Sequence, residues 1–110
     1  MITEKRTATR VDSHIVVEMN FPGEFPRYCG YIENLSEKGM GVISLESFQI
    51  GTKLTITFVL PGTLDRVTTV ASIVRTGPGM GMLNYHAFAF ENLSELDRQK
   101  IIQYVRENAA

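Results

Sequence analysis

Two arginines lie four residues apart near the start of the chain, in the stretch RTATR at residues 6–10. Each carries a planar cation with five N–H donors, which can form paired hydrogen bonds with one partner. Arg6 and Arg10 have polar neighbours and precede the first stretch with apolar periodicity, so neither fits a hydrophobic core. This spacing arises often by chance, and its meaning therefore depends on a second motif.

The second motif is ENLSEKG at residues 33–39, where Asn34, Ser36 and Gly39 form the pattern N-x-S-x-x-G after an expected strand. Asn and Ser side chains can turn back on the local backbone at such corners, and glycine can supply a positive φ. Two interpretations follow. The three residues build a turn, or Asn34 and Ser36 point outward as a fixed hydrogen-bonding pair. This pattern is much rarer by chance than the arginine spacing.

The other residues with reactive side chains do not form a recognisable catalytic, metal or phosphate site. His14 and His86 are isolated in strand patterns without acidic or cysteine neighbours at ligand spacing, which favours neither a metal site nor catalysis. Cys29 lies in an apolar strand and is predicted to be a small buried residue. GPGMGM at residues 77–82 lacks the Lys-Ser/Thr ending of a phosphate loop and precedes a strand, which indicates a hairpin loop. The sequence therefore does not favour an enzyme.

The elements that must position the two motifs are mostly short strands. Alternating apolar residues separated by turn signals predict six of them. A helix is expected over about residues 94–107, with Ser94 as its N-cap and Asp97 three residues later. This series is typical of an antiparallel barrel or sandwich with a C-terminal helix packed against it. The expected strands cover residues 13–21, 28–35, 40–45, 53–60, 66–75 and 85–90.

Length and composition limit the classes of protein that remain. A chain of 110 residues fits one domain with a real core, and a net charge of −1 gives no general case for nucleic acid or a membrane surface. The single cysteine fits a reducing compartment. Neither the apolar region of a signal peptide nor an apolar run long enough to span a bilayer is present in the sequence, so a cytoplasmic location is expected.

The two motifs and the strand pattern together resemble the PilZ domain, a family of bacterial receptors for cyclic di-GMP. KRTATR resembles the R-x-x-x-R arm of the family, and NLSEKGMGV resembles its [D/N]-x-S-x-x-G turn, which enters the third strand. The stretches GTKLTITFVLP, ASIVRTG and HAFAF are similar to the fourth, fifth and last strands. The resemblance implies a mainly all-β fold. It consists of a flexible N-terminal arm over residues 1–12 and a six-stranded antiparallel β-barrel with a C-terminal α-helix over residues 13–110.

The resemblance also implies roles in binding cyclic di-GMP, which carries two phosphates and two guanines. Arg6 and Arg10 match the family arginines, whose forks fit a phosphate or the O6/N7 edge of guanine. Asn34 and Ser36 match residues that hydrogen-bond a guanine, and Gly39 should act through its backbone shape. The arm is expected to fold over the bound ligand, which couples binding to order.

Two positions depart from the family pattern. Asn34 stands where Asp is commoner, and the loss of a carboxylate acceptor is expected to weaken binding. Lys5 stands where many members carry a further arginine, and a lysine gives a point charge without a plane for stacking on a second ligand. Lys5 therefore either attracts a phosphate or lies in solvent. Both cases predict one cyclic di-GMP per chain.

The sequence thus predicts a cyclic di-GMP receptor that changes the conformation of its arm and signals to a protein partner. No catalysis, resident cofactor, metal, direct contact with DNA or RNA, or membrane insertion is expected. The alternative is a PilZ-fold interaction module that does not bind nucleotide, against which the intact arginine pair and turn argue. A barrel for single-stranded nucleic acid would need a basic groove lined by aromatics, which neither charge nor aromatic placement predicts.

Overall fold

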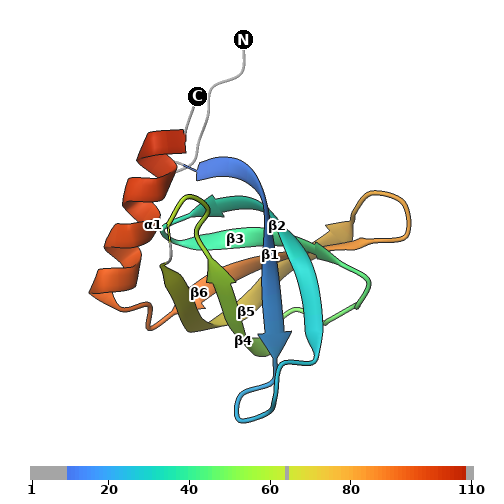
Figure 1. Cartoon of the computed structure of the whole chain (residues 1–110). Helices are drawn as coiled ribbons and strands as arrows, with labels where there is room; N and C mark the ends of the chain where they lie inside the picture. The colour runs from blue at the N-terminus through green and yellow to red at the C-terminus, as the bar shows by residue number, and fades with distance from the viewer. Residues whose placement is uncertain (1–9, 64, 109–110) are drawn as a thin grey trace.

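The computed structural model of the chain describes residues 10–63 and 65–108, with residues 10–14 described by their backbone alone. The strands form one closed antiparallel barrel in the order β1-β2-β3-β6-β5-β4, and the single helix packs against it (Figure 1). This confirms the expected fold class. The elements are β1 (Arg10–Asn20), β2 (Tyr28–Ser36), β3 (Gly39–Ser44), β4 (Lys53–Val59), β5 (Arg66–Pro78), β6 (Asn84–Glu91) and α1 (Glu95–Asn108).

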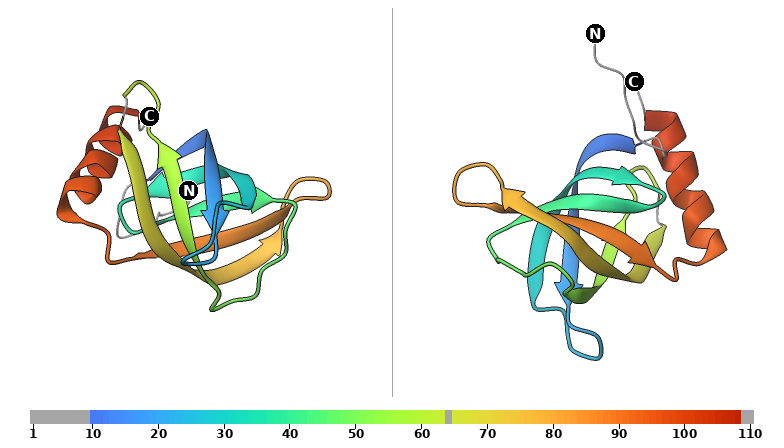
Figure 2. Two further views of the ribbon diagram at one scale, coloured as in Figure 1. Left: turned by 60° about the horizontal axis from the view of Figure 1, so that its bottom comes forward. Right: turned by 180° about the vertical axis from the view of Figure 1, so that it is seen from behind.

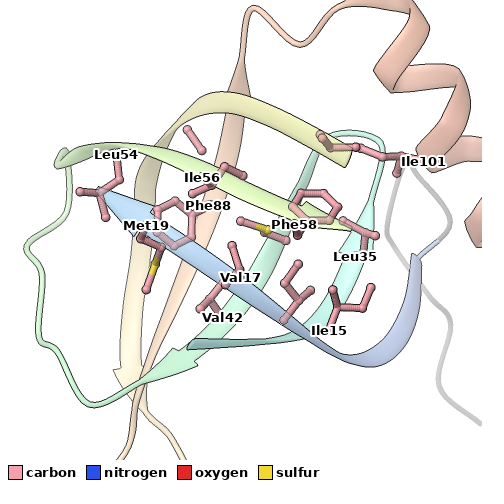
Figure 3. Close-up of a cluster of buried hydrophobic side chains, with 14 of the residues drawn as sticks. Ile15, Val17, Met19, Leu35, Val42, Leu54, Ile56, Phe58, Phe88 and Ile101 are labelled. Carbon is pink, nitrogen blue, oxygen red and sulfur yellow. The ribbon is translucent and has the colours of Figure 1, made fainter. Parts of the chain in front are cut away.

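The core of the barrel forms because alternate side chains of each strand point inward. In β4, Leu54, Ile56 and Phe58 are buried, while the threonines between them are partly exposed. Figure 3 shows this cluster, to which α1 contributes Ile101 and Val105. Burying one such side chain contributes about 1.5–3 kcal/mol relative to leaving it in water. The helix therefore covers one end of the barrel as part of the same core.

The start of α1 follows the predicted capping pattern. The hydroxyl of Ser94 accepts a hydrogen bond from the backbone N–H of Asp97 at 3.1 Å. This satisfies one of the donors that the first turn of a helix leaves without an intrahelical partner. Glu95 and Asp97 also place negative charge at the positive end of the helix dipole.

Strand β1 differs from its expected bounds at both ends. It begins at Arg10 instead of Ser13, because its first residues already pair with β2 through Arg10 and Ser36. It ends at Asn20, so Phe21 lies outside the strand. The pairing also contains an irregularity between Asp12 and Ile15, which the alternating pattern of the sequence does not reveal.

The prediction that Cys29 is buried is wrong, since the structure places it on the outside of the barrel. The inward positions of this part of β2 belong to Gly30 and Ile32. Because side chains of a strand alternate between its two faces, Cys29 and Tyr31 point outward. Residues 28–32 are all apolar, aromatic or small, so composition could not distinguish the two faces.

His86 is buried at the end of the barrel, where it holds the β3–β4 loop. Its Nε2 accepts the backbone N–H of Phe48 at 3.0 Å, and the two rings lie 5.5 Å apart. Tyr28 and Phe21 pack edge-on against Phe48. Burial lowers the pKa of His86, and the negative charge of Glu46 opposes this shift in part. The neutral imidazole is therefore part of the folded structure.

We expect this histidine to make stability depend on pH. Since the folded pKa of His86 lies below the ordinary value, its contribution is complete above about pH 6.5 and is lost as the pH falls toward the folded pKa. The melting temperature should therefore fall by a few degrees between about pH 7.5 and about pH 5. His86→Gln keeps an acceptor for Phe48 without titrating in this range, and should reduce the fall, whereas His14→Gln serves as the control. Equal pH dependence in the parent and His86→Gln would contradict the assignment.

Candidate ligand-binding groove

A groove of about 230 Å³ lies on the outer surface of β2, β3, β5 and β6. Gly39 and Ala89, which form a cross-strand pair, line it together with Ala87. Because none of these residues has a side chain larger than a methyl group, the backbone itself forms the floor. Such a floor allows the flat face of a ligand to approach the sheet closely.

Asn34 and Tyr85 meet above Gly41. A Cβ added at Gly41 would lie 2.8 Å from Asn34 Nδ2 and 2.7 Å from Tyr85 Cε1. Glycine at this position therefore lets an amide and a phenol approach one another at the edge of the groove. The sequence-based prediction named Asn34 but missed Gly41 and Tyr85. The second glycine of GMGV, inside a strand, was the available signal.

The turn between β2 and β3 is held by Ser36. Its Oγ accepts the backbone N–H of Lys38 at 3.2 Å and donates to the carbonyl of Gly39 at 3.4 Å. In this structure Ser36 thus follows the first of the two interpretations, a side chain that turns back on the local backbone. The carbonyl of Lys38 in addition accepts the N–H of Phe90 at 3.0 Å, which fixes the turn against β6.

The expected positive φ at Gly39 is wrong, because the glycines with positive φ are those at other turns. Glycine is required there for a different reason. A Cβ at Gly39 would collide with the backbone carbonyl of Phe88 on the neighbouring strand β6. The position therefore depends on a close approach between strands rather than on a special backbone conformation.

Cationic residues surround the groove. Arg75 of β5 and Lys38 of the turn line it, and neither was among the predicted site residues. The backbone of Arg10 pairs with Ser36, so β1 starts beside the motif turn. Lys5 and Arg6 lie outside the described residues. No local signal in the sequence points to Arg75. It lies two residues after the buried Ile73, a spacing that in a regular strand would place it inward, and it is exposed because the β5–β6 pairing is irregular between these two residues.

An ion pair connects the motif turn to α1. Arg98 Nη1 lies 3.1 Å from Glu37 Oε1, and Arg98 Nη2 lies 2.9 Å from Glu95 Oε2. The hydrogen bonds from Arg98, followed by one from Gln99, lower the pKa of Glu95 to about 2. Exposed pairs of this kind contribute little free energy, so their effect here is to position the turn relative to the helix.

Two further classes of site receive no support from residues 10–63 and 65–108. Within these ranges, no group of three or more His, Cys, Asp or Glu side chains could hold a metal ion. The described part of the chain also contains no helix with the length and apolar character needed to cross a membrane.

A closed antiparallel barrel with a polar turn and a cation-lined outer groove has the features of a ligand-binding module. The family model described as PilZ domain matches residues 4–107. The chain therefore belongs to the PilZ domain family, whose members are receptor and adaptor domains. No curated protein sequence matches the chain.

Solved structures share the fold. MotI (DgrA), an inhibitor of motility from Bacillus subtilis, superposes with a TM-score of 0.82 at 21% identity, over 96% of this chain and 51% of that chain. The PilZ domain of YcgR from Escherichia coli, solved with c-di-GMP, gives 0.72 at 15% identity, over 96% and 92%. The longer YcgR structure with c-di-GMP gives 0.77 at 15% identity, over 94% and 46%. The chain thus spans about half the length of MotI and of the longer YcgR structure.

Proposed function

We propose that this PilZ domain binds cyclic di-GMP in the groove and passes the signal to a protein partner. One observation carries the proposal: the motif turn, the start of β1 and two cationic side chains, Lys38 and Arg75, surround one groove. Cationic side chains suit the two phosphates, and polar side chains at the rim suit the edges of guanine. The similar fold of a YcgR domain solved with this ligand supports the choice of nucleotide.

In the proposed complex, Arg6 and Arg10 bind a phosphate and the O6/N7 edge of a guanine. The amide of Asn34 hydrogen-bonds the edge of that guanine that carries N1–H and N2–H. Ser36 exchanges its long contact of 3.4 Å with the Gly39 carbonyl for a shorter bond to the ligand. The N-terminal arm changes its conformation on binding and folds over the ligand, which changes the surface that a partner meets.

The proposal describes a receptor that needs neither catalysis nor a resident cofactor, and that acts in the bacterial cytoplasm. Calorimetric titration with cyclic di-GMP tests it, with GTP and cyclic di-AMP as controls. Saturable binding of cyclic di-GMP alone, at about one ligand per chain, is the expected result. Absence of binding would favour the interaction module that does not bind nucleotide. A ratio of two would show that Lys5 does not limit the stoichiometry, and Lys5→Arg would then leave it unchanged.

Arg75 provides a test of the groove itself. Arg75→Gln is expected to weaken cyclic di-GMP binding about tenfold or more, because a charge-assisted contact with phosphate is lost. The matched control is Arg66→Gln, which removes the same charge from the other end of β5. Titration of both variants should separate a local contact from the general effect of net charge. An equal loss in the two variants would contradict a ligand bound beside Arg75.

A further inference from the structure

A row of apolar side chains crosses the outside of the barrel next to the groove. Val16 pairs with Tyr31, Tyr31 with Ile43, and Ile43 with Tyr85, across β1, β2, β3 and β6. Directly paired residues place their side chains on the same face of a sheet. Val16 and Tyr31 are 54% and 50% exposed. The row is therefore continuous, and much of it meets solvent.

The β5–β6 hairpin projects beyond the barrel, as Figures 1 and 2 show. It begins next to Tyr85, the last residue of this row. Asn84 Nδ2 donates to the carbonyls of Leu45 at 3.2 Å and Glu46 at 3.1 Å, which fixes the hairpin beside the β3–β4 loop. Leu45, Met80 and Met82 are 71%, 79% and 89% exposed. We call the combined surface the apolar face; it consists of Val16, Tyr31, Ile43, Tyr85, Leu45, Met80 and Met82.

The segments that form most of this surface carry no charge. Residues 28–32, 39–45 and 76–90 contain no Asp, Glu, Lys or Arg, although 21% of the chain is charged. Glu18, which pairs with Cys29, marks one margin. Loss of charged residues together with enrichment of Tyr and Met distinguishes the centres of protein–protein interfaces from other surfaces. Exposed methionines also adapt their shape to a partner.

We propose that the apolar face is the docking site for a protein partner whose own contact surface is apolar and uncharged. An uncharged partner is required because a charged group buried against this face would find no ion-pair partner within the three uncharged segments. A lipid surface fits less well, since these segments supply no Lys or Arg for the phosphates of the headgroups. The inference deepens the proposed function, which requires a protein partner.

The apolar face and the groove share one residue. Tyr85 pairs with Ile43 in the apolar row, and it also lines the groove. A partner seated on the face would therefore contact the edge of the ligand site. Occupancy of the groove can in this way change the surface that the partner recognises.

A phage-displayed peptide library selected on the folded protein provides the probe. Peptides rich in aromatic and aliphatic residues and poor in charge are expected to be enriched. Their affinity should fall at least about tenfold in Tyr31→Lys and in Met82→Lys, because each variant buries a lysine without a partner. Leu96→Lys is the control, since Leu96 is also exposed but lies on α1, on the other side of the barrel from the β5–β6 hairpin (Figure 1). Absence of enrichment, or an equal loss in the control, would overturn the proposal.

Cys29 supplies a second readout without any engineering. It is the single cysteine of the chain, it is exposed, and it lies two residues from Tyr31 on the same face of β2. A bound peptide should slow its alkylation by iodoacetamide several-fold. Unchanged alkylation with saturating peptide would place the peptide elsewhere and count against the proposal.

Two other occupants of the apolar face, a lipid surface and a second copy of the chain, would give different results. Cosedimentation with phosphatidylcholine vesicles that is lost in Met82→Lys would assign the face to lipid. A dimer in analytical ultracentrifugation that dissociates in Tyr31→Lys would assign it to a second copy. Either result overturns the proposal. Tyr31→Lys and Met82→Lys should bind cyclic di-GMP like the parent. If the parent protein captures peptides but does not bind cyclic di-GMP, the proposed ligand is refuted while the docking site stays supported.

Discussion

Replacing Arg10 with alanine is expected to weaken cyclic di-GMP binding by about 1.5–3 kcal/mol, or roughly ten- to a hundredfold. The backbone of Arg10 is fixed by pairing with Ser36, at the edge of the groove that Lys38 and Arg75 line. Because strand pairing already places the backbone of Arg10 there, binding has less of the chain to reorganise. Arg6→Ala should have a similar effect, on the basis of its match to the family motif.

Calorimetry on Arg10→Ala and Arg10→Lys separates charge from geometry. Lysine keeps the charge but loses the paired donors, so Arg10→Lys should recover only part of the affinity. Arg27→Ala, which removes an exposed arginine from the loop at the opposite end of β1, should bind like the parent. Unchanged affinity in Arg10→Ala would refute the proposed role. Loss of the melting transition would show instead that Arg10 serves the fold.

The fold could be predicted from sequence where one local pattern determined the structure. In β4, large apolar residues alternate with threonines, so Leu54, Ile56 and Phe58 could be assigned to the core without knowledge of their neighbours. Ser94 and Asp97 gave the start of α1 in the same way. These elements have one apolar and one polar side, so the sequence alone predicts which side faces the core.

Strand β2 shows where that approach fails. Its first residues offer apolar or small side chains to both faces, and the interior takes Gly30 and Ile32 while Tyr31 and Cys29 remain outside. The apolar face next to the groove is the cause, because a surface without charges removes the polar half of the alternation. The lack of charged residues that made the burial prediction for Cys29 wrong is therefore also the observation from which we infer a docking site.

The candidate site was predictable only as far as its motif. Asn34, Ser36 and Gly39 stand in one short stretch, whereas Arg75 and Tyr85 reach the groove because β3 pairs with β6 and β6 pairs with β5. That strand order depends on closure of the whole barrel, and no local pattern contains it. For the same reason the sequence could not show why position 39 must be glycine.

Gly39→Val is expected to destabilise the fold by about 3 kcal/mol, the upper end for an overpacked position, and to lower the melting temperature by more than about 10 °C. The added Cβ would collide with the carbonyl of Phe88, which is backbone and cannot rotate away. Separation of β3 from β6 would also displace the turn held by Ser36, so cyclic di-GMP binding should fall with stability.

The cause of this loss can be tested with smaller substitutions. Gly39→Ala and Gly39→Asn should both destabilise the protein, because any Cβ meets the Phe88 carbonyl. If position 39 instead required a positive φ, asparagine would be tolerated much better than alanine, since it adopts that conformation more readily. Gly77→Ala is the control, because a Cβ at Gly77 meets no atom within 4 Å. Thermal melts of the three variants decide between the two causes. The close approach of β3 and β6 predicts that alanine and asparagine at position 39 lower the melting temperature equally, and that Gly77→Ala leaves it unchanged.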